Sequence, residues 1–283
     1  MVIRLNHPSL ELDDIDLLER IVEERQRGIH HAYFLQIKDA WKTRVREYIQ
    51  FGGNSEFIEA WEEMNDPSVH GRFKNLYLSP GNQSVQKPLL EKLRNRELDY
   101  CPSCGEDGTP NTLDHYLPKD VFPEFSVTIL NLFPMCDICQ GAKGVKTNDD
   151  EGKRLFIHPY FDDFIDQQVL VLDIREPFNA PTSIQLYPHP DIDRELQKLI
   201  SRHIAELKIH ARYYRYFQSN YLRLLRLVGK IRHKGLNVRE QLDNFRDMAL
   251  EKSINSWGYI FYDGVLRNEH LVEYLSNEEL PMV

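Results

Sequence analysis

Apolar residues near the start of the chain recur at intervals of three and four positions. This spacing predicts one or two amphipathic helices between Asp13 and about Gln50, ended by the sequence Gly52-Gly53-Asn54. Shorter patterns predict helices at 56–64 and 87–96, so the first hundred residues are expected to be helical. The residues expected on the apolar faces of the first helices are Leu17, Leu18, Ile21, Ala32, Leu35 and Val45.

The last third of the chain shows the same helical spacing over a longer stretch. Apolar positions from 196 to 228 predict a long helix that ends by Gly235. Asn237 is a suitable N-cap for a second helix that runs to about Asn255. The apolar run 257–262 is expected to be buried.

Charge is distributed unevenly over this pattern. The chain has a formal net charge of -9, but the segment from Arg194 to Arg239 holds twelve Lys and Arg residues against two acids, a balance of +10 that leaves -19 for the remainder. Two interpretations stay open: a face that binds phosphate groups, or a solvated helix face that pairs with the acidic N-terminal helices. The aromatic residues within 212–217 could pack in a helix core or stack on nucleic-acid bases. Because they follow helical spacing, we prefer the core interpretation.

All four cysteines of the chain lie in two Cys-x-x-Cys pairs, separated by 31 residues. Each such turn presents two thiolates to one metal ion, and a tetrahedral Zn²⁺ takes four. Disulfides need an oxidising compartment, and residues 1–4 lack the layout of a signal peptide, so we expect reduced thiols in the cytoplasm. No apolar run is long enough to span a membrane. The prediction is a structural zinc ion bound by Cys101, Cys104, Cys136 and Cys139.

The stretch between the cysteine pairs predicts two strands and a helix. Leu113-Asp114-His115 is expected to end a short strand, and residues 127–132 are apolar and β-branched as in a second strand. The short basic stretch 140–146 is expected to begin a helix at the second cysteine pair. Strand, loop, strand and helix around a metal ion is the layout of a ββα-metal nuclease.

The residue types in this stretch suit phosphodiester hydrolysis. A base must activate water near neutral pH, and histidine is the side chain whose ordinary pKa allows this. A hard cation such as Mg²⁺ or Mn²⁺, held by a carboxylate and an amide, can neutralise the charge on the departing oxygen. A zinc ion enclosed by four thiolates has no open position for this purpose. The sequence therefore indicates two metals, one structural and one catalytic.

From Cys101 to Lys146 the chain resembles the zinc-knuckle type of HNH endonuclease. The family pattern is Cys-x-x-Cys, Asp-His-x-x-Pro, Asn, then Cys-x-x-Cys-Asn-x-x-Lys. The resemblance implies that His115 is the general base, that Asp114 binds the catalytic divalent ion, and that Asn131 braces the loop that carries His115. Gln140 stands where the family has Asn or His; its amide oxygen can bind a hard cation, but the longer side chain displaces that oxygen. The expected contacts to nucleic acid are Lys119, Lys143 and Lys146.

Three strings, at 112–119, 122–126 and 158–162, also resemble the PtuB-like HNH subunit of Septu-type and retron-type antiphage systems. This resemblance implies an effector nuclease, acting on DNA or on RNA, whose partner is an ABC-type ATPase. Because Gln140 departs from the family pattern, a second interpretation stays open: a cleavage-impaired, zinc-stabilised subunit that binds nucleic acid or a partner protein.

Together these features predict an α+β fold, a mostly helical protein with an embedded zinc-bound ββα-metal core. The expected regions are a helical part at 1–97, the HNH core at 98–165, and at 166–283 a strand pair followed by helices that include the basic one. The strands of that pair are expected at 169–174 and 183–187. His158 has two possible roles: a half-buried residue that caps a turn, or a wall residue or metal contact of the site. We prefer the first.

Overall fold

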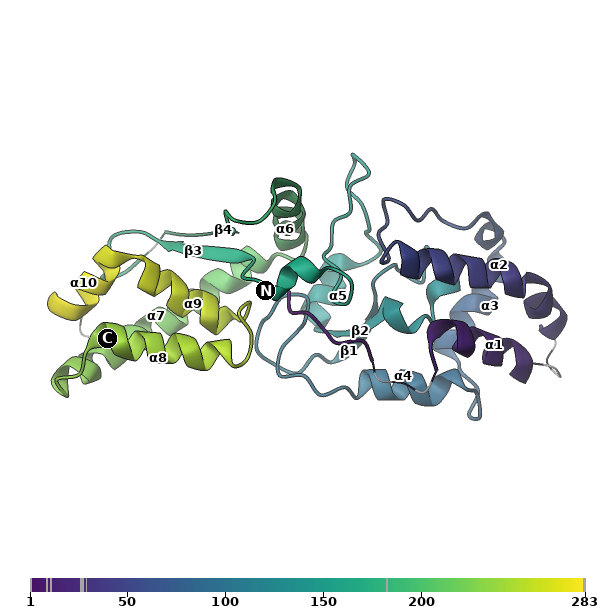
Figure 1. The fold of residues 1–283 in the computed structure, drawn as a ribbon, viewed down its shortest axis with the longest axis horizontal. Coiled ribbons are helices and arrows are strands. Elements are labelled where there is room, and N and C mark those ends of the chain that lie inside the picture. Colours follow the sequence, from purple (N-terminus) through teal and green to yellow (C-terminus); the bar gives the residue numbers. More distant parts are fainter. Residues whose placement is uncertain are drawn as a thin grey trace. The chain divides into compact units, whose positions relative to one another are not determined.

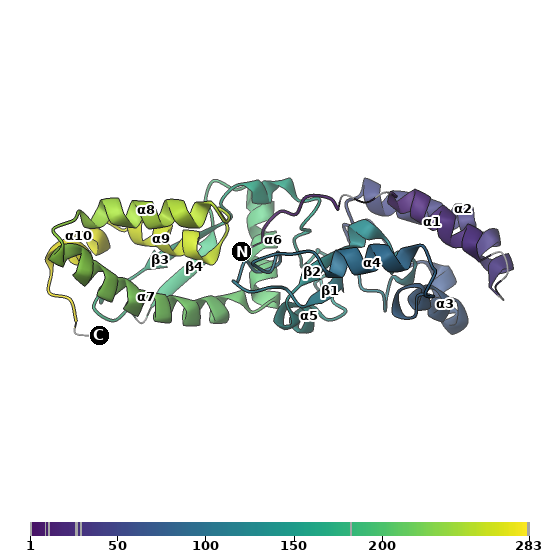
Figure 2. The ribbon, with the colours of Figure 1, turned by 90° about the horizontal axis from the view of Figure 1, so that it is seen from below.

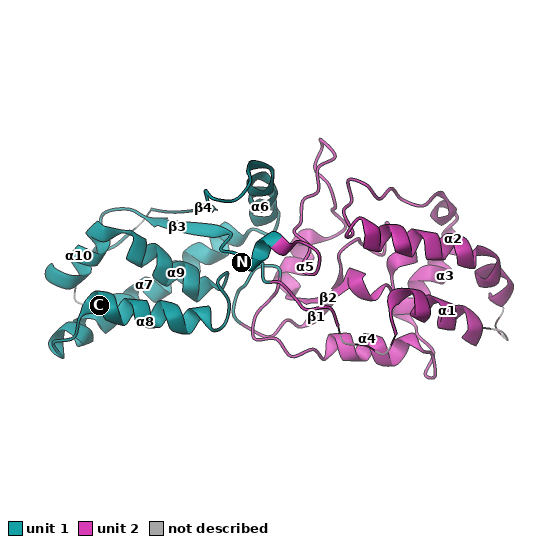
Figure 3. Cartoon of the chain, in the orientation of Figure 1, with its two compact units in different colours: residues 1–3, 103–107, 164–283 teal, residues 4–102, 108–163 magenta. Residues whose placement is uncertain are grey.

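A computed structural model describes residues 2–8, 10, 12–25, 28, 30–181 and 183–281 of the chain. Helices make up 53 % of it and the strands form two-stranded sheets, which confirms the predicted mostly helical α+β fold. Two compact units are present (Figure 3): unit 1 comprises residues 1–3, 103–107 and 164–283, and unit 2 comprises residues 4–102 and 108–163. The division into separate regions at 1–97, 98–165 and 166–283 stays a prediction.

The helices and strands are labelled in Figure 1. Those of unit 2 are α1 (Asp14–Glu24), α2 (His31–Gln50), η1 (Glu62–Asn65), α3 (Pro67–Leu78), α4 (Gln86–Arg94), β1 (Thr112–His115), η2 (Pro123–Phe125), η3 (Ile129–Asn131), β2 (Leu132–Met135) and α5 (Asp137–Lys143). Those that follow are η4 (Asp163–Asp166), β3 (Leu170–Ile174), β4 (Ile184–Pro188), α6 (Arg194–Glu206), α7 (Ile209–His233), α8 (Val238–Leu250), α9 (Trp257–Arg267) and α10 (Glu269–Asn277).

Helices α1 and α2 lie side by side in unit 2 (Figures 1 and 2). Asp13 caps α1, because its side chain accepts hydrogen bonds from two N–H groups of the first turn. Ala32 and Leu35, predicted on the apolar face, are exposed, because the buried stripe of α2 passes through neighbouring positions. The residues of that stripe are Phe34, Ile37, Trp41, Val45 and Tyr48.

The segment between α2 and α4 differs from its prediction. The predicted helix 56–64 is reduced to the short turn η1 near its end, and the unpredicted helix α3 follows. Asp66 caps α3, and Pro67 stands in its first turn, where a missing N–H group costs nothing. Phe73 of α3 packs edge-to-face on Trp41 with ring centroids 4.9 Å apart, so α2 and α3 share one core. The next helix, predicted at 87–96, is confirmed as α4.

The ββα segment of unit 2 carries the candidate site. Strand β1 pairs antiparallel with β2, with His115 opposite Leu132. The prediction of a strand at 127–132 is wrong, because residues 129–131 form the turn η3 and the strand begins only at Leu132. This turn is held from a distance: the Asp14 carboxylate, 115 residues away, accepts hydrogen bonds from two N–H groups at η3.

In unit 1 the predicted strand pair is confirmed as β3 and β4. Helix α9 lies along β3 (Figures 1 and 2), and an added Cβ on Gly264 would approach Leu172 to 2.8 Å, so only glycine allows this packing. Helix α8 lies beside α9 and begins, as predicted, after Asn237, whose side chain accepts a backbone hydrogen bond from the first turn. It ends at Leu250 rather than at about Asn255.

The predicted long basic helix is two helices, α6 and α7. They are separated at Lys208, which has a left-handed backbone with φ of 53°. Tyr213 and Phe217 of α7 are fully buried, which confirms the core interpretation of the aromatic stripe. Arg223 and Arg226 lie on the exposed side of the same helix. Within the part of the chain that the structure describes, no helix is both long and apolar enough to cross a bilayer.

Candidate active site and metal centre

The four cysteines predicted as zinc ligands come together. Their sulfur atoms all lie within 4.8 Å of one another, three of the four residues are buried, and none of them forms a disulfide. Thiolates placed about 2.3 Å from one Zn²⁺ ion in a tetrahedron stand about 3.8 Å apart, so only small shifts are needed to enclose the ion. The donor set and its spacing therefore fit a structural zinc ion.

Hydrogen bonds to these cysteines come from neighbouring turns and helices. The Cys136 N–H donates to Cys101 Sγ at 3.4 Å. Within unit 1, the Arg212 guanidinium donates to Cys104 Sγ at 3.5 Å, and Trp257 Nε1 donates to the Cys104 carbonyl at 2.6 Å. Such donors, and the positive charge of arginine, offset the negative charge that four thiolates bring to one zinc ion. Sequence analysis missed Arg212 because 108 positions separate it from Cys104.

His115 ends β1 and is 4 % exposed. Its Nε2 lies 2.9 Å from the carbonyl oxygen of Ser126; a carbonyl only accepts hydrogen bonds, so Nε2 carries the proton and Nδ1 is left as the acceptor of the ring. Burial lowers the pKa of His115 to about 3, so the ring is neutral at pH 7. A neutral imidazole in one fixed tautomer is the form that a general base requires.

Asn131 is completely buried beside the loop that follows His115. Its Oδ1 accepts a hydrogen bond from the Leu117 N–H at 2.7 Å. Its Nδ2 donates to the carbonyls of Leu117 and Phe125 at 3.1 and 3.0 Å. One amide thus joins the two ends of the loop 117–125, which is the geometry that a brace of this loop needs.

Helix α2 holds the segment that contacts His115, a feature that sequence analysis missed. Trp41 Nε1 donates to the Glu124 carbonyl at 2.8 Å, and an Arg44 guanidinium nitrogen lies 2.9 Å from the Glu124 carboxylate. Glu124 has no exposed surface, and burial raises the pKa of its carboxyl. No local pattern marks these contacts, because at least 80 positions separate the partners. They fix η2, which leads directly into Ser126.

Helix α5 brings two further candidates toward β1. It begins at Asp137, inside the second cysteine pair and earlier than the predicted stretch 140–146. Gln140 and Lys143 are three positions apart and therefore share one side of this helix. Both side chains on that side meet Asp114 of β1.

The contacts of Asp114 decide whether a hard cation fits. Its Oδ1 accepts a hydrogen bond from Gln140 Nε2 at 3.3 Å, and Lys143 Nζ lies 3.0 Å from its Oδ2. The ammonium group forms an ion pair there without hydrogen-bond geometry and donates instead to the His115 carbonyl at 2.7 Å. Asp114 Oδ2 is thus a buried oxygen that accepts no hydrogen bond. This oxygen is of the kind that Mg²⁺ and Mn²⁺ prefer, whereas Gln140 presents its amide nitrogen to Asp114 and would have to turn its amide over to add a second oxygen.

Lys143 is buried in this structure, and its predicted contact with nucleic acid stays a prediction. Its side chain is 1 % exposed, because its ammonium group is turned inward to Asp114 and to the His115 carbonyl. Lys146 is exposed, and the partly exposed Lys119 lies 3.9 Å from the Asp120 carboxylate. The predicted contacts of Lys119 and Lys146 with nucleic acid also stay predictions.

His158 is fully buried rather than half-buried. Its Nε2 lies 3.0 Å from the Tyr48 hydroxyl, and its Nδ1 accepts the Tyr160 N–H at 3.1 Å. Burial lowers the pKa of His158 well below its ordinary value. The residue caps the turn that follows it, in line with the structural interpretation of its sequence context.

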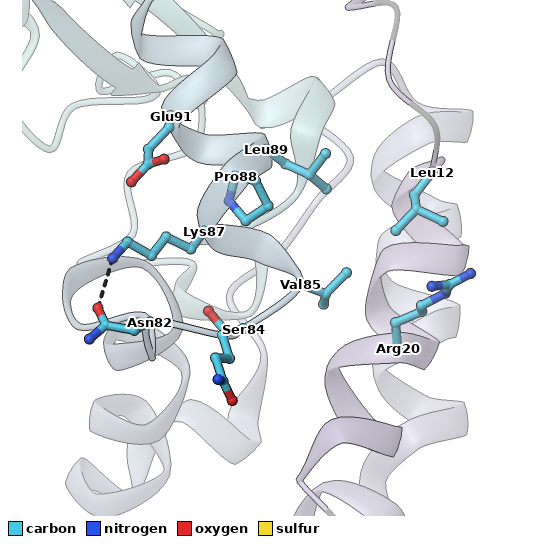
Figure 4. A pocket seen from close by; sticks show the side chains of 10 residues that line it. Leu12, Arg20, Asn82, Ser84, Val85, Lys87, Pro88, Leu89 and Glu91 are labelled. Carbon is cyan, nitrogen blue, oxygen red and sulfur yellow. Dashed lines mark hydrogen bonds between the residues drawn. The ribbon is translucent and has the colours of Figure 1, made fainter.

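A cavity of 660 Å³ lies elsewhere in unit 2 (Figure 4). Leu12 and Arg20 form one side, and residues 82–91 form the other. Lys87 is turned to Asn82, to which it donates at 2.8 Å. None of the predicted site residues, all of which are described, lines this cavity. It is therefore separate from the candidate site.

Two known proteins match segments of the chain. Over 65 residues it is 46 % identical to Protein ea31 of Escherichia phage lambda. The matched segment covers 23 % of this chain and 22 % of that protein. Over 91 residues it is 32 % identical to Septu protein PtuB of Bacillus thuringiensis, a distant homologue. This matched segment covers 30 % of this chain and 34 % of that protein. The chain thus spans about a fifth to a third of the length of these relatives. No family model and no solved structure matches it.

Proposed function

We propose that the protein is a metal-dependent endonuclease of the HNH type that hydrolyses phosphodiester bonds of DNA, or of RNA. The hydrogen bond from His115 Nε2 to the Ser126 carbonyl carries this proposal, because it keeps Nδ1 available as a proton acceptor. Asp114, the residue beside His115 on β1, has a buried carboxylate oxygen that accepts no hydrogen bond. A base and a cation ligand on one short strand are the two parts that the reaction needs.

In the proposed reaction His115 Nδ1 takes a proton from water while the water oxygen attacks phosphorus. The bond from phosphorus to the leaving oxygen then breaks, and that oxygen takes up a proton from solvent. An entering phosphate raises the low pKa of His115, because a nearby negative charge favours the imidazolium form. Asp114 and the Gln140 amide oxygen would hold Mg²⁺ or Mn²⁺, which supplies charge neutralisation at the leaving oxygen. The four cysteines would hold zinc and serve the structure alone.

The biological setting is part of the proposal. Distant homology to Septu protein PtuB supports a role in antiphage defence. We take the protein to be the cytoplasmic effector subunit of a defence complex whose partner is an ABC-type ATPase. Co-purification from the native host with mass spectrometry of the bound proteins tests this partner, and recovery of the chain alone would contradict it.

The nuclease proposal is tested with His115→Ala. With the co-purified partners present and with Mg²⁺ or Mn²⁺, the native protein should nick or cut plasmid DNA. The variant should lose at least about a hundredfold in rate, since it lacks the general base. His233→Ala, at an exposed position of α7, is the matched control and should keep full activity. Zinc content and circular dichroism verify that both variants are folded, and equal rates for His115→Ala and the native protein would refute the assignment.

A specific observation also favours a second function. Gln140 donates its amide N–H to Asp114, and Lys143 neutralises the same carboxylate, so the free protein does not present a bare cation site. The chain would then be a cleavage-impaired, zinc-stabilised subunit that binds nucleic acid or its partner. Gln140→Asn separates the two functions: increased cleavage supports a detuned nuclease. Binding without cleavage by either form, with the partner present, supports the second function.

A further inference from the structure

The one buried lysine of the candidate site stands at the carboxylate that would bind the divalent ion. Lys143 Nζ lies 3.0 Å from Asp114 Oδ2 and 2.7 Å from the His115 carbonyl oxygen, and it lies 5.9 Å from the centroid of the Phe156 ring. Among these three neighbours Asp114 is the only one that carries a negative charge. A buried ammonium group needs such a partner, because leaving water without one is costly.

The charges around Asp114 sum to zero before any metal arrives. Asp114 contributes one negative charge, Lys143 one positive charge, and the amide of Gln140 none. Protein sites for hard divalent cations gain affinity from the negative charge of their ligands. The ammonium group cancels that charge here and repels a second cation at the same carboxylate.

We propose that Lys143 is the resident cation of Asp114 and that it opposes the binding of the divalent ion. The inference rests on the proposed function, because it concerns the divalent-ion site of that nuclease. A Mg²⁺ or Mn²⁺ ion takes the carboxylate only as the ammonium group gives it up. The flexible four-carbon side chain of lysine allows this movement, and a substrate phosphate is the anion that can then receive the ammonium group. Metal affinity is consequently low in the absence of nucleic acid.

Mn²⁺ binding to the zinc-loaded full chain tests the inference without any measurement of cleavage. Electron paramagnetic resonance reports the free Mn²⁺ concentration during a titration. Lys143→Met should bind Mn²⁺ at least about tenfold more tightly than the native protein, because the repelling charge is gone. Lys234→Met removes an exposed lysine that has no role in the proposed site and should leave the affinity unchanged. Asp114→Asn should abolish the binding in either background.

The outcomes separate the inference from the proposed function. Asp114-dependent binding that is equal or weaker in Lys143→Met overturns the inference and leaves the nuclease proposal standing. No Mn²⁺ binding in either protein overturns the divalent-ion site itself, and the inference with it. Folding of each variant is checked by zinc content and circular dichroism.

A measurement on the native protein covers the case in which Lys143→Met does not fold. An amine-modifying reagent followed by mass spectrometry reports the accessibility of each lysine. Lys143 should be protected without divalent ion and several times more reactive when Mg²⁺ is added, because the ion displaces it from Asp114. Lys146 serves as the internal reference. Unchanged or increased protection of Lys143 in Mg²⁺ would overturn the inference.

Discussion

Replacing Asn131 by alanine tests the brace of the loop that follows His115. The change removes three hydrogen bonds from a side chain with no exposed surface. It leaves the N–H group and the carbonyl of Leu117 without a partner, whereas the Phe125 carbonyl keeps the Thr128 N–H. Each buried backbone group that loses its partner costs about 1–3 kcal/mol, and water that enters the vacated space recovers part of this. We expect the free energy of unfolding to fall by about 2–4 kcal/mol. Asn131→Asp keeps one acceptor but sets a buried carboxylate against two carbonyl oxygens, so it should destabilise the protein at least as much.

Urea denaturation at a fixed zinc concentration, followed by circular dichroism, measures this loss. Amide hydrogen exchange at Leu117 adds a local measurement, because its N–H group bonds directly to Asn131 Oδ1. Asn82→Ala, at an exposed position, is the matched control and should change stability by less than about 1 kcal/mol. A loss below about 1 kcal/mol for Asn131→Ala, with unaltered exchange at Leu117, would refute the reasoning.

Two further predictions concern the zinc site and pH. Arg212→Met should release zinc to a chelator about tenfold faster than the native protein, because the donor to Cys104 is lost, whereas the exposed Arg215→Met should not; equal release rates would contradict this role. Burial raises the pKa of Asp14 from 3.8 to about 7, so the folded state binds this proton more tightly than the unfolded state. The stability that this proton contributes is complete below pH 3.8 and is lost as the pH rises to about 7. Asp14→Asn stays neutral, so its unfolding free energy relative to that of the native protein should rise from near zero at pH 4 to about 4 kcal/mol at pH 7. A difference that does not change with pH would contradict the raised pKa of Asp14.

Features that depend on short-range spacing could be predicted from the sequence. The two cysteine pairs, the strand that ends at His115, the N-cap at Asn237 and the hairpin of β3 and β4 all arise from residues close together in the chain. The cysteines come together because each turn fixes two sulfur atoms, and this leaves only the docking of two turns to the fold. Such elements keep their local preference in the folded protein.

Features that depend on distant partners could not be predicted. Residues 127–132 have the composition of a strand, but Asp14 holds η3 in a turn. Lys143 resembles a surface lysine in the sequence, and only the start of α5 at Asp137 turns it inward to Asp114. In both cases a carboxylate from another part of the chain decides a contact that no local sequence pattern indicates.

The hydrogen bond and the ion pair from α2 to Glu124 limit the transfer of the ββα segment to another protein. Excised at 98–165, it would leave Trp41 and Arg44 behind, together with Asp14 of α1. Glu124 would then meet solvent in place of its cation, and the Ser126 carbonyl, which selects the tautomer of His115, would lose the support that α2 gives to η2. A graft of the proposed nuclease site onto another scaffold would therefore have to include the N-terminal helices, which supply these contacts.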